Sequence, residues 1–178
     1  ILSATISEGD MATLDGITES GNALSITVTD TIVAATELNN LDSKTTTDLT
    51  VTSSTITGSA SDLITAYAAA GSINGLGNEA ISLSDTSIDA TVLLALDALT
   101  TGIIDASSIT TLTGADSDQD AARASSGITG LPGSSISSLT ISAAQVEALI
   151  ADPNSFFGYS ASAPIIIEGA ITSAQASL

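Results

Sequence analysis

The chain has 178 residues, 43% of them apolar and only 2% aromatic, and its 2 basic and 20 acidic side chains give a net charge of −18. So acidic a chain repels phosphate groups, which excludes nucleic acid as a partner, and no apolar run is long enough to insert into a membrane as a spanning helix. Cysteine and histidine are absent. This excludes disulfides, zinc sites built on those residues and nucleophiles activated by imidazole, so we expect a non-enzymatic protein.

The apolar pattern predicts short strand–helix units along the chain. Residues 6–14 place an isoleucine eight residues before a leucine, and residues 141–149 do the same, with one more unit opening at 170–178. Between them, residues 81–89, "ISLSDTSID", alternate apolar and polar side chains as a half-buried strand does, and 90–102, "ATVLLALDALTTG", repeat apolar side chains at helical spacing up to Gly102. The same pattern predicts a strand over 103–114 and a helix over 115–127, which ends at Gly127.

The sequence also repeats over a longer distance. Residues 26–80 align with residues 81–135, so that Ile26 falls on Ile81, Asp30 on Asp85 and Leu38 on Leu93, a shift of 55 residues. We therefore expect one repeat domain over 1–178, with divergent flanking units at 1–25 and 136–178.

The order of these units predicts the fold. Strand–helix units in tandem indicate an α/β solenoid, in which stacked units share a parallel sheet with helices on one side, and small aliphatic side chains suffice for the core. The alternative is a parallel β-helix whose helices are short turns. Both ends of the chain are expected to stop within the array without capping units, which would expose sheet edges to further copies.

Three sequence segments resemble parts of known proteins. "TTGIIDASSITTLTG", "AYAAAGSINGLGNEAISLSDT" and "ASSGITGLPG" resemble tandem repeats in very large, acidic cell-surface and extracellular proteins of marine cyanobacteria. The resemblance covers residues 26–135. It implies an extracellular or cell-surface location and a structural or adhesive role, and it brings no defined active site.

The densest group of acids suggests a metal site. Asp116, Asp118 and Asp120 alternate as the ligands of an EF-hand calcium loop do, but that loop requires glycine and glutamate where this chain has Ala121 and Gly127. The acids are therefore expected to start a helix, which Asp116 or Ser117 caps, and weak surface calcium binding is the alternative.

Repeated acids give a second candidate site. Asp30 and Asp85, and likewise Asp42 and Asp97, occupy aligned positions, and rows of carboxylates about 4.8 Å apart would bridge calcium ions. The alternative is that Asp30 and Asp85 form turns between strand and helix, while Asp42 and Asp97 are solvated.

The remaining polar features predict architecture. The glycine-rich stretches at Gly75 and Gly130 lack a phosphate-binding pattern and predict turns, while threonine runs such as "LTVT" are typical of strand faces in solvent. Tyr67 is expected on a helix flank, and the aromatic group at 156–159 beside or over the stacked units.

Two functions remain. The first is a structural repeat module of an extracellular filament, sheath or surface layer, which assembles with copies of itself by end-to-end or lateral stacking. The alternative is a calcium-dependent adhesin segment that binds extracellular polysaccharide or a surface.

Overall fold

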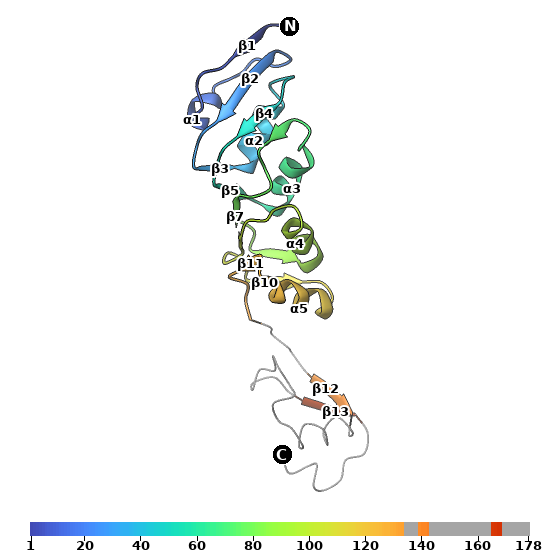
Figure 1. Ribbon diagram of the computed structural model, residues 1–178. Coiled ribbons are helices and arrows are strands. Elements are labelled where there is room, and N and C mark those ends of the chain that lie inside the picture. The colour runs from blue at the N-terminus through green and yellow to red at the C-terminus, as the bar shows by residue number, and fades with distance from the viewer. Residues whose placement is uncertain (134–138, 143–164, 169–178) are drawn as a thin grey trace. The chain divides into compact units, whose positions relative to one another are not determined.

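Short strands and short helices follow one another along the chain (Figure 1). The computed structural model describes residues 1–133, 139–142 and 165–168. The chain forms two compact units, Ile1–Pro132 and Gly133–Leu178. Of the second unit, the structure describes β12 (Leu139–Ser142) and β13 (Ile165–Glu168), which pair in parallel. Most of the flanking segment 141–149, the aromatic group at 156–159 and residues 170–178 lie outside the described residues.

The first unit contains all but the last three residues of the segments that the sequence aligns at 55 residues. Its elements in chain order are β1 (Ser3–Thr5), α1 (Met11–Leu14), β2 (Ala23–Val28), β3 (Ile32–Ala34), α2 (Ala35–Asp42), β4 (Leu49–Val51), β5 (Thr55–Gly58), α3 (Ala60–Ala68), β6 (Ile73–Asn74), β7 (Ala80–Leu83), β8 (Ser87–Asp89), α4 (Ala90–Asp97), β9 (Ile104–Asp105), β10 (Thr111–Thr113), α5 (Asp116–Ala124) and β11 (Ile128–Thr129).

Every described strand pair is parallel. One sheet has the order β1-β2-β4-β6, a second has the order β11-β9-β7-β5-β3, and β8 pairs with β10. Parallel neighbours need a crossover connection, which the helices provide where they lie between paired strands. The predicted α/β class with parallel strands is therefore confirmed.

The strands are shorter and more often interrupted than the sequence predicted. Residues 81–89 do not form one strand, because the chain bends at residues 84–86 between β7 and β8, and residues 103–114 are divided in the same way between β9 and β10. Ser84 and Asp85 lie in this bend, and aspartate in particular favours turns over strands. The described strands therefore form several short sheets instead of the single sheet expected.

The core of the first unit contains a row of aliphatic side chains in register. Across the five-stranded sheet, residues 23 to 25 positions apart are paired. One continuous line of these pairs is buried, from 0% to 7% exposed: Val33, Ile56, Ile81, Ile104 and Ile128. Because each strand contributes one such residue, the core needs no large aromatic anchor.

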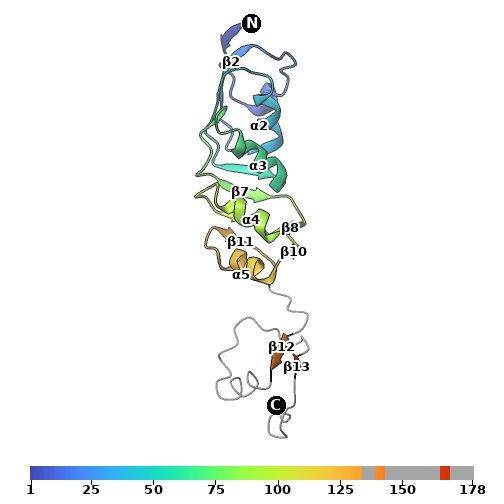
Figure 2. The same ribbon diagram turned by 90° about the vertical axis from the view of Figure 1, so that its right-hand side faces the viewer.

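The helices lie along one side of these strands, with α2, α3, α4 and α5 in successive contact (Figure 2). Each of α2 to α4 turns a fully buried leucine inward, at Leu38, Leu63 and Leu93. The helix predicted within 90–102 is confirmed as α4, but it ends at Asp97, and Gly102 does not cap it. A Cβ atom at Gly102 would collide with the carbonyl oxygen of Glu79, so glycine is needed there for close approach of two segments.

Candidate functional site

The acidic stretch at the start of α5 does not form a calcium loop. Asp116 is the first helical residue, and Ala115 occupies the N-cap position without a side-chain hydrogen bond. The expectation that Asp116 or Ser117 caps the helix was therefore wrong, because the chain turns one residue earlier. Asp116 and Asp118 lie in the first turn, where negative charge favours the positive end of the helix. Asp120 forms an ion pair with Arg123, in which Asp120 Oδ1 lies 3.8 Å from Arg123 Nη1.

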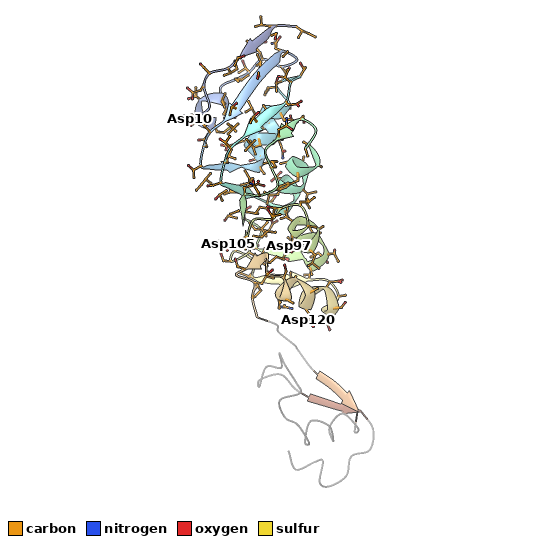
Figure 3. The ribbon with its side chains drawn as sticks, in the orientation of Figure 1. Asp10, Asp97, Asp105 and Asp120 are labelled. Carbon is orange, nitrogen blue, oxygen red and sulfur yellow. The ribbon has the colours of Figure 1, made fainter. Side chains whose placement is uncertain are left out.

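The acids come from different elements of the first unit. Figure 3 shows Asp10 before α1, Asp97 at the end of α4, Asp105 in β9 and Asp120 in α5. Across the residues that the structure describes, no group of three or more acidic side chains gathers to hold one metal ion. Calcium binding to one or two surface carboxylates stays a prediction.

Asp30 and Asp85 each bind the start of a helix earlier in the chain. The Met11 N–H, at the first position of α1, donates to Asp30 Oδ2 at 2.8 Å, and the Ala60 N–H, at the first position of α3, donates to Asp85 Oδ2 at 2.7 Å. First-turn N–H groups have no partner inside their own helix, so a carboxylate satisfies them well. The aligned aspartates therefore share one structural contact, which differs from the local turn that the sequence suggested. Calcium binding by Asp30 and Asp85 stays a prediction.

Glycine takes this position beside α2 and α4. Extending the strand pairing places Gly58 beside Ala35, the first residue of α2, and Gly114 beside Ala90, the first residue of α4. Both glycines have positive φ, 147° and 105°, which is unfavourable for other residues. Aspartate and glycine thus alternate beside the starts of α1 to α4.

A second pair of aligned aspartates holds the loop that follows the next helix. Asp42 accepts a hydrogen bond from the Ser72 hydroxyl at 3.0 Å, and Asp97 accepts one from Ser125 at 2.7 Å. Asp97 also lies so close to Gly127 that a Cβ atom there would collide with its carboxylate. These acids are tied into neighbouring segments, although the sequence suggested that they are solvated.

Asp89 is the N-cap residue of α4, and Asp105 holds a local turn. Hydrogen bonds from Thr91 hold the pKa of Asp89 below its ordinary value, the larger effect from its hydroxyl and the smaller from its backbone N–H. The hydrogen bond from the Ser107 N–H lowers the pKa of Asp105 in the same way. Both carboxylates are therefore stabilised in the charged form, Asp89 at the start of α4 and Asp105 in its turn.

Threonine hydroxyls link neighbouring strands. Thr52 donates to the Val28 carbonyl at 2.9 Å, and Thr110 donates to the Thr86 carbonyl at 3.0 Å. Thr113 and Thr129 make the same kind of bond to carbonyls 25 residues earlier. Because these hydroxyls already donate to backbone carbonyls, they are less available to bind a polysaccharide than unbonded hydroxyls would be.

Gly75 and Gly130 form the turns expected of them. Their φ angles are 98° and 80°, and each lies against the backbone of the preceding segment, Gly75 at Val51 and Gly130 at Ser107. A side chain at either position would push that segment away, so the glycines serve packing.

A buried carboxylate in the β6–β7 loop was missed by the sequence reasoning. Glu79 is only 3% exposed, and three donors converge on it: the Tyr67 hydroxyl, the Gly77 N–H at 2.8 Å and the Asn78 N–H at 3.0 Å. The Thr100 hydroxyl donates to the Glu79 carbonyl at 3.0 Å. We call these five residues the Glu79 cluster.

Tyr67 lies inside this cluster and not on a helix flank. Its ring is 7% exposed, and burial, together with the hydrogen bond to Glu79 and the negative charge of Glu79, raises the pKa of Tyr67 above its ordinary range. No sequence signal points to Glu79, because the aligned position in the second copy is a serine, Ser134.

An open depression of about 370 Å³ lies beside the Glu79 cluster. It is lined mainly by polar residues: Val51, Thr52, Ser53, Ser54, Gly75, Asn78 and Glu79. The hydroxyl of Ser53 is buried and has no hydrogen-bond partner, so no base activates it as a nucleophile. The depression can accept polar groups, but the residues described here do not assemble a catalytic pair.

Comparison with protein-family models, with curated proteins and with solved structures found no match to this chain. Among the described residues, no helix has both the length and the apolar character needed to cross a membrane.

Proposed function

We propose that this chain is a non-enzymatic structural module of an extracellular filament, sheath or surface layer. In this proposal the strand–helix units form an α/β solenoid, and copies of the module assemble by end-to-end or lateral stacking. Its location at the cell surface or outside the cell follows from the resemblance of residues 26–135 to repeats of large acidic extracellular proteins.

The observation that supports the proposal best is that aspartates at aligned positions of the two copies bind neighbouring segments. Asp30 and Asp85 bind helix starts, and Asp42 and Asp97 bind loops, as described above. Parallel pairing at 23 to 25 residues supports stacking of successive units. Such contacts between successive segments are those that an extended structural module needs.

Light scattering of the full chain tests this function. In seawater-like salt with calcium, the mean mass is expected to rise with protein concentration, since salt screens the repulsion between copies of net charge −18. A mass that stays at one chain over the whole concentration range would overturn the proposal.

A calcium-dependent adhesin that binds polysaccharide is the second candidate. The exposed acids of α5, Asp116 and Asp120, favour it, since carboxylate oxygens are ligands that calcium prefers. The melting temperature of the parent chain should then rise with calcium and fall with chelator, and the Asp116→Asn/Asp120→Asn variant should lose part of that shift. An unchanged melting temperature of the parent would remove this candidate.

A further inference from the structure

An asparagine–glycine pair lies where β6 ends. Asn74 is the last residue of β6, Gly75 follows it, and both are exposed. No other asparagine in the sequence precedes a glycine. Such a pair is chemically distinct, because the backbone nitrogen that follows an asparagine can attack the side-chain amide, and glycine has no Cβ atom to hinder the approach.

The surroundings leave both reacting groups accessible. β6 lies at the end of the described sheet β1-β2-β4-β6, so only one of its edges is paired there. The Gly75 N–H donates no hydrogen bond within the part of the chain that the structure describes. The Asn74 amide donates from Nδ2 to Asp48 Oδ2 at 3.1 Å, and this contact is exposed to solvent. A two-residue strand at a sheet edge opens locally at low cost, which lets the Asn74 amide turn toward the Gly75 nitrogen.

The second copy forms the same turn without a reactive amide. At the 55-residue shift, Asn74 aligns with Thr129 and Gly75 with Gly130. Thr129 is the last residue of β11 and is exposed like Asn74, and both glycines have positive φ, 98° and 80°. The turn therefore forms with threonine in place of asparagine, and the fold gives no reason for an amide at position 74.

The other asparagines in the described part of the chain are less suited to this reaction. Asn39 and Asn40 lie within α2, where helical hydrogen bonds hold the backbone nitrogens that follow them. The side-chain oxygen of Asn22 accepts from the Leu2 N–H at 2.9 Å, and its next residue is an alanine. Asn78 precedes a buried glutamate. Asn74 thus combines exposure with an unhindered neighbour.

We propose that Asn74 is a site of spontaneous deamidation, with water as the co-reactant. The Gly75 nitrogen loses its proton and attacks Asn74 Cγ, a C–N bond forms, and Nδ2 leaves as ammonia together with that proton. Water then adds to one of the two carbonyl carbons of the cyclic imide and opens it to aspartate or isoaspartate. No electrons are transferred. Because an amide becomes a carboxylate, the chain gains one negative charge and about 1 Da.

Either product loosens β6. The Asp48 carboxylate loses its donor and faces a second carboxylate, and like charges this close repel each other. Isoaspartate also lengthens the backbone by one methylene before Gly75, which lies tightly against the backbone of Val51. The loop after β6 carries Glu79, so the change loosens the junction between the repeats 26–80 and 81–135. The inference goes beyond the proposed assembly function, because it concerns a reaction within one chain.

Peptide mass spectrometry of the folded full chain tests the reaction. At mildly alkaline pH, Asn74 should convert at least about tenfold faster than the other described asparagines, because its neighbour alone lacks a side chain. The rate should rise with pH, since the attacking nitrogen must lose its proton. Asn74→Thr, which has the residue of β11 at this position, should keep the fold and abolish the conversion. Conversion of Asn74 no faster than that of Asn40 or Asn78 would overturn the site.

Hydrogen exchange tests the consequence for β6. Converted and unconverted chains differ by one charge and separate on an ion-exchange column. Backbone amides over 73–79 should exchange faster in the converted chain, while those of β11, the matching strand of the second copy, should not change. Asn74→Asp has the added charge without the longer backbone and should show a smaller increase than the isoaspartate form. Equal exchange over 73–79 in converted and unconverted chains would overturn the loosening of β6.

Discussion

Two regions of the first unit hold neighbouring segments together by different means. The row from Val33 to Ile128 repeats one kind of contact, an aliphatic side chain on its paired neighbour, in strand after strand. The Glu79 cluster occurs once, and it places a carboxylate under the surface with donors from α3 and from its own loop. The row gives cohesion that any similar side chain can provide, whereas the cluster depends on the hydrogen bonds of particular atoms.

The largest effect is expected in the aliphatic row. Ile56→Ala removes a fully buried side chain from the middle of the five-stranded sheet and should lower the free energy of unfolding by about 3 to 4 kcal/mol in urea titrations. Ile32→Ala, at a 61% exposed position of β3, is the matched control and should change it by less than about 0.5 kcal/mol. Equal costs at the two positions would contradict the row as the core.

The Glu79 cluster should be nearly as sensitive. Glu79→Ala leaves the Tyr67 hydroxyl and two backbone N–H groups without an acceptor, at an expected cost of about 3 kcal/mol. Glu79→Gln keeps one oxygen acceptor and should cost less, and Glu19→Ala, at an exposed glutamate, should cost almost nothing. A neutral Glu79→Ala variant would show that the cluster contributes nothing to stability.

Alkaline pH provides a third comparison. The raised pKa of Tyr67 means that the unfolded chain loses this proton first, so the stabilisation is complete below about pH 10 and is lost as the pH rises. Between about pH 10 and 12, the free energy of unfolding should fall by about 2 kcal/mol more in the parent chain than in Tyr67→Phe. Parallel pH profiles for the two proteins would contradict the burial of the phenol.

The smallest effect is expected at the helix starts. Asp85→Ala removes the acceptor of the Ala60 N–H and should cost about 1 kcal/mol, while Asp85→Asn, which keeps an oxygen, should cost less. Asp116→Ala changes an exposed acid of α5 and should stay within about 0.5 kcal/mol of the parent. Thermal and urea unfolding of the three variants measure the difference.

The sequence predicted best what depends on neighbours along the chain. The alternation at 81–89 and the leucines within 90–102 predicted the strand β7 and the helix α4, because side-chain period is a local property of strands and helices. The α/β class and the parallel pairing followed from the order of these elements.

The sequence could not predict what depends on segments about 25 residues away. Asp30 and Asp85 occupy aligned positions, but their partners are the N–H groups of Met11 and Ala60, which belong to earlier helices of the chain. Glu79 carries no local sign of burial, because a glutamate between glycine-rich turns is normally exposed. The bends that divide the strands were also missed, since serine and threonine occur in strands and in turns alike.

Electron microscopy and fibre diffraction of assembled full-length chain test the central claim most directly. In concentrated protein with seawater-like salt and calcium, we expect filaments or sheets, and a reflection near 4.8 Å along the stacking direction from rows of parallel strands. Isolated single-chain particles at every concentration, with and without calcium, would contradict the account.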